Sequence, residues 1–447
     1  MTASRQLAAL GLAMIVLTLA GLALHQPGAV TLPSLRLTWL FVGLMAVAAG
    51  GYFRAVALVL RQPLPARSLW LVLAVALVLR VLVLPVPPFL SSDMFRYVWD
   101  GMVQNAGINP YRFIPADPAL AALRDPFIYP HVNRASYALT AYPPAAELVF
   151  RAIAAIRPGV LAMKVAMLGF DLLAIVAVMA VLARAGLPRQ RVLIYAWNPL
   201  AVWAFAGNAH VDAIAVGLIG VALLARLRQR DGLAGALLGA AILVKFLPAA
   251  IAPALWRRGD WRLPVACLAV IVALYGCYSG VGWQVFGFLP GYAAEEGIDK
   301  AGGLWLAGVI GALVPLAPRV YLAAAGAGLL ALGVWVALRP RAPADPGRDI
   351  VRVAGDAAML AAATTVVLSP HYAWYYAWLA LPCCICPLRS VIYLSAAGLL
   401  LYVNPLNEHV LWPSLLFVPA LVLAVPDFRR LVPGRLGAPE AAIGRSP

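Results

Sequence analysis

Apolar runs of about twenty residues recur from one end of this sequence to the other, and they constrain the fold more than any other feature. A helix needs about 20 apolar residues to cross a hydrocarbon core roughly 30 Å thick. Hydrophobic residues make up 64% of the 447-residue chain and charged residues only 12%. A soluble domain carries roughly 25% charged residues, so this composition excludes a soluble enzyme and a disordered chain. We predict an all-α polytopic membrane protein.

We expect about 11 to 13 transmembrane helices, depending on how many apolar segments enter and leave on the same face. The segments are 7–24, 37–60, 69–87, 160–183, 192–207, 212–228, 233–256, 263–280, 303–318, 320–338, 354–381 (with a break at Pro370), 391–404 and 410–425. We divide the chain into two leading transmembrane helices (1–68), a central module (69–256) and a C-terminal transmembrane module (257–447). The central module includes a long external loop (88–142).

The formal net charge of +16 could indicate a nucleic-acid partner. However, the arginines cluster in short loops between apolar runs, which is typical of loops that face the cytoplasm. Loops 61–68 and 184–191 are therefore expected inside, and residues 88–142 outside. Beyond residue 232 the parity is ambiguous, because the clusters at 257–262 and 339–352 both look cytoplasmic. Both can be inside only if one apolar segment beyond residue 232 returns on the face it entered. The candidates are the proline-containing stretch around 248–253 and the short 303–318 run.

The external loop contains the first candidate catalytic residue. Ser92-Asp93 is a natural helix start, and the spacing predicts an amphipathic helix over 93–106 that lies flat on the membrane. Asp93, Arg96 and Asp100 share its polar face. At 1.5 Å per residue the two carboxylates are about 10 Å apart and cannot contact one reacting atom. Asp93 suits a general base; the alternative is a helix cap at Asp93 and an Arg96–Asp100 ion pair.

Ionisable groups inside apolar runs cost about 2.5–3.5 kcal/mol each and need a partner or a function. Asn208, His210 and Asp212 form a polar group at an outer helix junction, which suits sugar or metal binding or, alternatively, a capped helix start. Lys245, three residues before Pro248, indicates a broken helix facing a cavity. A phosphate is its natural partner, and snorkelling to the interface is the alternative.

A fourth polar site is the aromatic-rich break Ser369-Pro-His-Tyr. His371 and Tyr372 could donate to a phosphate oxygen or a sugar hydroxyl, although an aromatic belt at the membrane interface is an equal alternative. The polar loop at 292–300 is expected to be solvated, with acceptor contact as the second interpretation. Lys164 and Asp171, seven residues apart in one run, are predicted to pair.

Three groups of motifs, in this order, resemble those of integral-membrane glycosyltransferases of the GT-C class. They are Ser-Asp93-Met-Phe-Arg-Tyr-Val-Trp-Asp100-Gly with the later Gly-Ile-Asn109-Pro-Tyr and Tyr-Pro-Pro; Asn-Ala-His-Val-Asp212 with Lys245-Phe-Leu-Pro; and Ser-Pro-His371-Tyr. Within the class, the chain most resembles the polyprenol-phosphate-mannose-dependent mannosyltransferases, including family 87 and its bacterial relatives. The likeness covers residues 69–381.

The resemblance implies an inverting hexosyltransferase in a bacterial inner membrane, with its active site facing outside. It would move a sugar, in this family mannose, from a polyprenyl-phosphate donor to a lipid or glycan acceptor. Asp93 takes the position of the catalytic base. The residues expected to bind substrate are Arg96, Asp100, Asn208, His210, Asp212, Lys245, His371 and Tyr372. Because Asp100 departs from the adjacent acidic pair or Asp-x-Asp pattern, a metal-free site is favoured, although a divalent metal remains open.

Two functions from other classes stay open. A lipid-linked-sugar flippase or secondary transporter would also place charges within the membrane, but it is expected to show internal repeats. The sequence shows no such repeat. A non-catalytic assembly subunit would not need Asp93 and Lys245 together.

Overall fold

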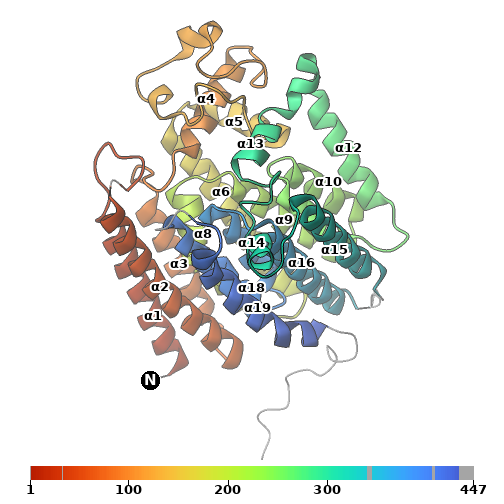
Figure 1. Cartoon of the computed structure of the whole chain (residues 1–447). Helices are drawn as coiled ribbons and strands as arrows, with labels where there is room; N and C mark the ends of the chain where they lie inside the picture. Colours follow the sequence, from red (N-terminus) through yellow and green to blue (C-terminus); the bar gives the residue numbers. More distant parts are fainter. Residues whose placement is uncertain (1, 33, 340–344, 405–407, 432–447) are drawn as a thin grey trace, which may run out of the picture.

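The computed structural model describes residues 2–431 apart from 33, 340–344 and 405–407, and every regular element in this part is helical. Six helices within these residues are long and apolar enough to cross a membrane (Figure 1). They are α1 (Ala3–Leu22), α2 (Leu35–Arg61), α6 (Val160–Arg184), α15 (Pro318–Leu338), α16 (Pro346–Leu368) and α19 (Leu411–Leu431). The predicted all-α membrane fold is confirmed.

The number of spans, however, is lower than the predicted 11 to 13: the described residues contain six, or up to eight if each bent pair counts as one. In one pair, α8 and η4 (Pro199–Gly207) meet α9 (Asp212–Leu227) at 117°; in the other, α12 (Arg262–Gly276) meets η6 and α13 (Ser279–Glu295) at 112°. Three apolar helices are shorter, namely α3 (Ser68–Val83), α10 (Asp231–Ile242) and α18 with η8 (Arg389–Tyr402). The prediction counted broken and short helices as full spans.

The breaks expected next to Pro248 and at Pro370 are both present. α10 ends at Ile242, and the chain resumes as η5 (Leu247–Ile251) and α11 (Ala252–Leu255). α16 ends at Leu368, where Ser369 adopts a left-handed backbone with φ of 42°. The chain then continues as η7 (Ala373–Leu379) and α17 (Ala380–Cys383). These two breaks deliver polar side chains into the interior of the bundle.

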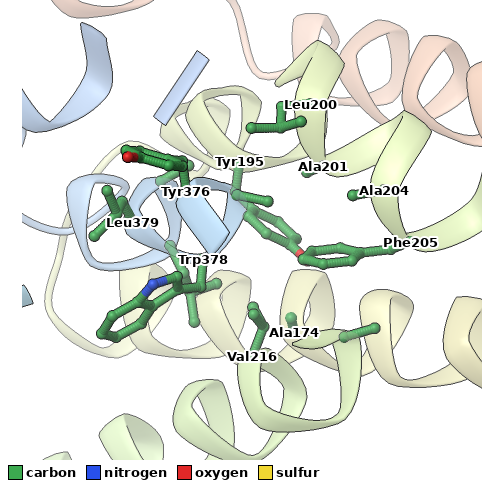
Figure 2. Close-up of a cluster of buried hydrophobic side chains, with 14 of the residues drawn as sticks. Ala174, Tyr195, Leu200, Ala201, Ala204, Phe205, Val216, Tyr376, Trp378 and Leu379 are labelled. Carbon is green, nitrogen blue, oxygen red and sulfur yellow. The ribbon is translucent and has the colours of Figure 1, made fainter. Parts of the chain in front are cut away.

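A buried apolar cluster holds the irregular segments in place (Figure 2). Tyr195 from α7 (Leu193–Ala196) and Phe205 from η4 lie beside Val216 of α9 and Trp378 of η7. All four side chains belong to the main hydrophobic core and are at most 5% exposed. Because this core contacts both η4 and η7, the junction at residues 208–211 is fixed close to the start of η7.

The 88–142 segment forms a helical layer with the element that follows it (Figure 1). α4 (Asp93–Asn105) confirms the helix predicted over 93–106, and η1 (Pro118–Leu123) and η2 (Tyr129–His131) follow it. α4 packs on α5 (Pro144–Ile156) so closely that a Cβ at Gly101 would lie 2.5 Å from the carbonyl oxygen of Phe150. The polar face of α4 is therefore buried in protein rather than solvated along most of its length.

Loops rich in arginine gather at one end of the bundle. Gln190 donates to the carbonyl of Pro65 at 3.3 Å, which joins the 184–191 loop to the 61–68 loop. Arg226 pairs with Asp349 at 3.0 Å, and Arg257 pairs with Asp231 at 3.0 Å. Asp231 also lies 3.6 Å from Arg226. The ends of α9, α10, α11 and α16 therefore meet here.

This arrangement brings the 257–262 and 339–352 clusters, whose parity was ambiguous, to the same end of the bundle. α14 (Trp305–Leu313) has nine residues, about 14 Å at 1.5 Å per residue, and cannot cross the bilayer. The short 303–318 run, one of the two candidates for a segment that does not span, is therefore too short to do so. Tyr321 at the start of α15 donates to the carbonyl of Val367 at the end of α16, so these two helices are antiparallel. Arg341, which belongs to the 339–352 cluster, lies outside the described residues.

The predicted Lys164–Asp171 pair is wrong. Asp171 instead accepts from Arg80 of α3 at 2.5 Å and from the Tyr195 hydroxyl at 2.6 Å. The Lys164 ammonium donates to the carbonyl oxygens of Val83, the last residue of α3, and of Val86 just after it. Arg80 and Lys164 therefore both connect α6 to α3 or to the residues just after it. For Lys164, carbonyl groups at the end of α3 are closer than Asp171, which lies two turns away on α6.

Candidate active site

A cavity of about 1440 Å³ lies beneath the 88–142 segment and between the two helix breaks. Its polar part is lined by side chains that include Asp93, Lys245 and His371. Its apolar part is lined by α11, α12, α15 and α16, with residues such as Trp256, Leu268, Ile271, Leu330, Val334 and Leu360. The cavity is larger than the roughly 300–1,000 Å³ that a drug-sized ligand occupies. Asp93 and Lys245, which we predicted to share a substrate, therefore share one cavity.

Asp93 begins α4, and its carboxylate makes tertiary rather than capping contacts. The amide of Asn133 donates to Asp93 Oδ1 at 2.8 Å, and Asp93 Oδ2 lies 3.6 Å from His210 Nδ1. The backbone N–H of Asp93 donates to the hydroxyl of Ser91 at 3.2 Å. Among the described residues, no backbone N–H donates to the carboxylate. The side chain is 18% exposed, and it faces the cavity.

The pKa of Asp93 is raised above its ordinary value. Burial is the largest cause, and the charge of Asp212 acts in the same direction. Lys245, Arg134 and the hydrogen bond from Asn133 oppose this shift but do not cancel it. A carboxylate with a raised pKa is a stronger base than an ordinary aspartate, and general bases work best with a pKa close to the operating pH.

Lys245 lies in the break after α10, as the sequence predicts. Its ammonium donates to both carboxylate oxygens of Asp212, at 2.8 and 2.9 Å, and lies 3.3 Å from the centre of the Tyr375 ring. The side chain is 17% exposed and lines the cavity. It does not snorkel to an interface, because Asp212 and Tyr375 hold the ammonium inside the bundle.

Three flat side chains stack beside Asp93. The His210 ring lies 3.8 Å from the Trp374 ring at 16°, and Trp374 lies 4.8 Å from Tyr372, also at 16°. Tyr372 and Trp374 line the cavity, whereas His210 is fully buried behind them. His210 therefore approaches Asp93 from within the protein and supports the aromatic wall.

His371 lies on the polar wall formed with the 292–300 loop. Its Nδ1 is 3.1 Å from Glu296 Oε2, and its Nε2 is 2.7 Å from the carbonyl oxygen of Gly303. Burial lowers the pKa of His371, but these two contacts outweigh it and raise the pKa above its ordinary value. Glu296 is only 8% exposed, so the prediction of a solvated loop is wrong at this position.

Five predicted substrate-binding residues are absent from the cavity lining: His210 and Asp212, whose contacts are given above, and Arg96, Asp100 and Asn208. Arg96 donates to both oxygens of Asp100 at 2.9 and 3.0 Å, and both side chains are buried. Asn208 accepts from the N–H of Leu90 at 3.1 Å and donates to the carbonyl of Trp203 at 2.9 Å. These side chains therefore hold α4 and the chain that leads into it, and the structure does not place them on the cavity wall.

The comparison with known protein families assigns the chain to a family. The model of the MptA_B family, described as alpha-(1->6)-mannopyranosyltransferase, N-terminal domain, matches residues 1–257. The chain belongs to this family. No curated protein and no solved structure matches the chain. The protein is thus an integral-membrane mannosyltransferase, and the matched part contains Asp93, the 88–142 segment and Lys245.

The structure adds to the candidate site two residues that the sequence did not indicate. Asn133 and Arg134 line the cavity from the end of the 88–142 segment. Tyr292, in the loop for which acceptor contact was the second interpretation, lines it from α13. Arg134 Nε donates to Glu295 at 2.7 Å, and the Tyr292 and Tyr375 hydroxyls are 2.6 Å apart. Polar residues in loops are ordinary, so their types gave no signal. Only the fold brings residues near 134, 245, 295 and 372 together.

Among the residues described, no group of three or more His, Cys, Asp or Glu side chains is arranged to hold a metal ion. The donors nearest Asp93 are an amide, from Asn133, and an imidazole, from His210. Asp212 uses both oxygens on Lys245. The metal-free site favoured by the sequence stays a prediction for the transferase.

Proposed function

We propose that this mannosyltransferase takes mannose from a polyprenyl-phosphate donor and transfers it, with inversion, to a lipid or glycan acceptor at the outer face of a bacterial plasma membrane. One observation carries the proposal: Asp93 and Lys245 line a single cavity whose other part runs between apolar helices. A polar sugar phosphate and a long hydrocarbon tail require such a two-part site. The size of the cavity is consistent with both.

In the proposed reaction, Asp93 takes the proton from an acceptor hydroxyl while the hydroxyl oxygen attacks the anomeric carbon of mannose. The bond between that carbon and the phosphate oxygen breaks, and its electron pair leaves with the polyprenyl phosphate. Attack from the face opposite the phosphate inverts the anomeric centre. Asn133 holds one carboxylate oxygen of Asp93, which leaves Oδ2 for the acceptor proton. The raised pKa of Asp93 favours this transfer.

The leaving group gains negative charge, and cavity-lining donors can stabilise it in a water-poor site. Lys245 and His371 are the cations we assign to this role, with Tyr372 donating to the sugar or the phosphate. Asp212 keeps the Lys245 ammonium in the break, so it contributes by positioning. Arg96, Asp100 and Asn208 contribute by holding α4.

The test is mannose transfer by the purified protein. Wild-type protein is incubated with polyprenyl-phosphate [14C]mannose and a membrane-lipid extract, beside Asp93→Asn and the control Asp117→Asn. Asp117 lies in the same external segment, caps η1 and is outside the cavity lining. We expect Asp93→Asn to lower the rate about 10²–10⁴-fold, the range for loss of a general base, and Asp117→Asn to match wild type.

Equal rates for Asp93→Asn and wild type would remove Asp93 from the mechanism. A product with retained anomeric configuration, read by NMR, would contradict inversion. If wild-type protein moved the donor across vesicle membranes without forming a glycoside, the flippase or transporter alternative would replace the transferase mechanism proposed here.

A further inference from the structure

Each cationic or cation-forming side chain among the described residues of the polar cavity wall is already paired with a carboxylate. The pairs are Arg134 with Glu295 at 2.7 Å, Lys245 with Asp212 at 2.8 Å and His371 with Glu296 at 3.1 Å. A phosphate entering the cavity must therefore compete with a protein carboxylate for any of these cations.

The three carboxylates differ in how easily a ligand can displace them. The side chain of Glu295 is 29% exposed, against 5% for Asp212 and 10% for Glu296. Asp212 also binds its lysine through both oxygens. Glu295 can exchange its partner for water at the least cost, because ion pairs between solvent-exposed groups contribute little to stability. Arg134 is thus the cation most readily available to an incoming anion.

The backbone also sets Arg134 apart. Its φ is 54°, in the left-handed region that non-glycine residues rarely adopt and that often occurs at functional sites. The carbonyl of Arg134 accepts from the N–H groups of Tyr137 and Ala138, which closes a tight turn. Asn133, one residue earlier, donates to Asp93. The same strained turn therefore holds the proposed base and directs a guanidinium along the cavity wall.

We propose that Arg134 binds the phosphate of the donor, and that Glu295 occupies this binding position until a phosphate displaces it. The inference rests on the proposed function, because it assumes a prenyl-phosphate donor. An arginine presents parallel N–H donors that match a phosphate as well as a carboxylate. Glu295 is the last residue of α13 (Leu289–Glu295), which lines the cavity through Leu289, Tyr292 and Ala293. Exchange at Arg134 therefore removes one of the two side-chain contacts of Glu295, and the Tyr137 hydroxyl, 2.9 Å from its other oxygen, keeps the second.

Binding of a short-chain prenyl phosphate to the purified full-length protein tests the exchange, with the matching prenyl alcohol as the uncharged ligand. Affinities are measured by isothermal titration calorimetry. We expect Glu295→Gln to tighten prenyl-phosphate binding about two- to fivefold, the range set by a partly exposed ion pair. We expect Arg134→Gln to weaken it at least about tenfold, as for loss of a charge-assisted hydrogen bond, and Arg134→Lys to be intermediate. Alcohol binding should not change.

Asp260→Asn is the matched control. Asp260 also pairs with an arginine, Arg262, at 3.0 Å, but neither residue lines the cavity. If Glu295 only fastens α13, Glu295→Gln will weaken phosphate binding rather than tighten it, and the inference fails. It also fails if Arg134→Gln weakens phosphate and alcohol binding equally. A wild-type protein that binds the phosphate no better than the alcohol would instead refute the proposed donor class.

Discussion

At the scale of single residues, the protonation of Asp93 depends on charges from distant parts of the sequence. Lys245 and Arg134 favour the carboxylate form, whereas burial and Asp212 favour the protonated form, and the balance raises the pKa. A general base must be deprotonated to act, so the rate of transfer should fall as the pH falls through this raised pKa. The acid limb of the pH–rate profile therefore reports on Asp93.

Lys245→Gln should move that acid limb to higher pH. The variant removes the positive charge that lowers the pKa of Asp93, so this pKa rises further. Asp212→Asn should move the limb to lower pH, because it removes a charge that raises the pKa. The measurement is kcat/KM against pH for mannose transfer. Shifts in the same direction, or no shift in either variant, would contradict the assignment of the limb to Asp93.

These residues also show how much of the site the sequence could predict. Lys245, His371 and Tyr372 are indicated by their positions in or beside apolar runs, and Asp93 by its position at the start of a helix in the external loop. The structure places all four on one cavity. Their catalytic and binding roles stay predictions. Arg134 could not be identified in this way, because an arginine in a polar loop is solvated and has no free-energy cost that would require a partner or a function. Its position depends on a left-handed backbone turn that no residue type at that position indicates.

At the scale of elements, proline positions predicted the two breaks that supply Lys245 and His371. The sharp bend at residues 208–211 was read instead as a turn between two complete spans, because hydropathy alone does not separate a broken helix from two helices. The close contacts between helices could not be predicted from the sequence either. A Cβ at Gly235 of α10 would lie 2.1 Å from the carbonyl oxygen of Leu263, and one at Gly239 would lie 2.6 Å from that of Cys267. Glycines four residues apart therefore allow α12 to pack directly on α10.

Gly235→Ala should destabilise the protein by about 1–3 kcal/mol, the usual range for overpacking, because the added methyl group separates α10 from α12. Since Leu238 of α10 and Cys267 of α12 line the cavity, the KM for the donor should also rise. Gly232→Ala is the matched control: it adds the same methyl group to α10, at a position with nothing within 4 Å. Thermal unfolding in detergent measures the difference, and equal Tm values for the two variants would refute the close packing.

At the scale of the whole molecule, contacts between loops define two ends. α3 and α6 are antiparallel. Gln190 after α6 contacts Pro65 before α3 at one end of the bundle, and Lys164 near the start of α6 contacts Val83 at the end of α3 at the other end. The arginine-rich loops lie at the end marked by Gln190 and Pro65. The 88–142 segment follows Val83 in the chain and lies at the opposite end. In Figure 1, α4 and α5 lie at the top and the N-terminus at the bottom. Because arginine-rich loops typically face the cytoplasm, this arrangement supports the proposed position of the cavity on the outer side.

Cysteine labelling in intact cells tests this orientation. Asp117→Cys in the 88–142 segment and Arg189→Cys in the 184–191 loop are made in a background whose five native cysteines are replaced by serine, since Cys277 is exposed and would react. A membrane-impermeant maleimide should label Asp117→Cys in intact cells and Arg189→Cys only after the cells are permeabilised. The reverse pattern would place Asp93 on the cytoplasmic side. Mannose transfer would then have to use a donor and an acceptor on the inner face, even though the geometry of the cavity would be unchanged.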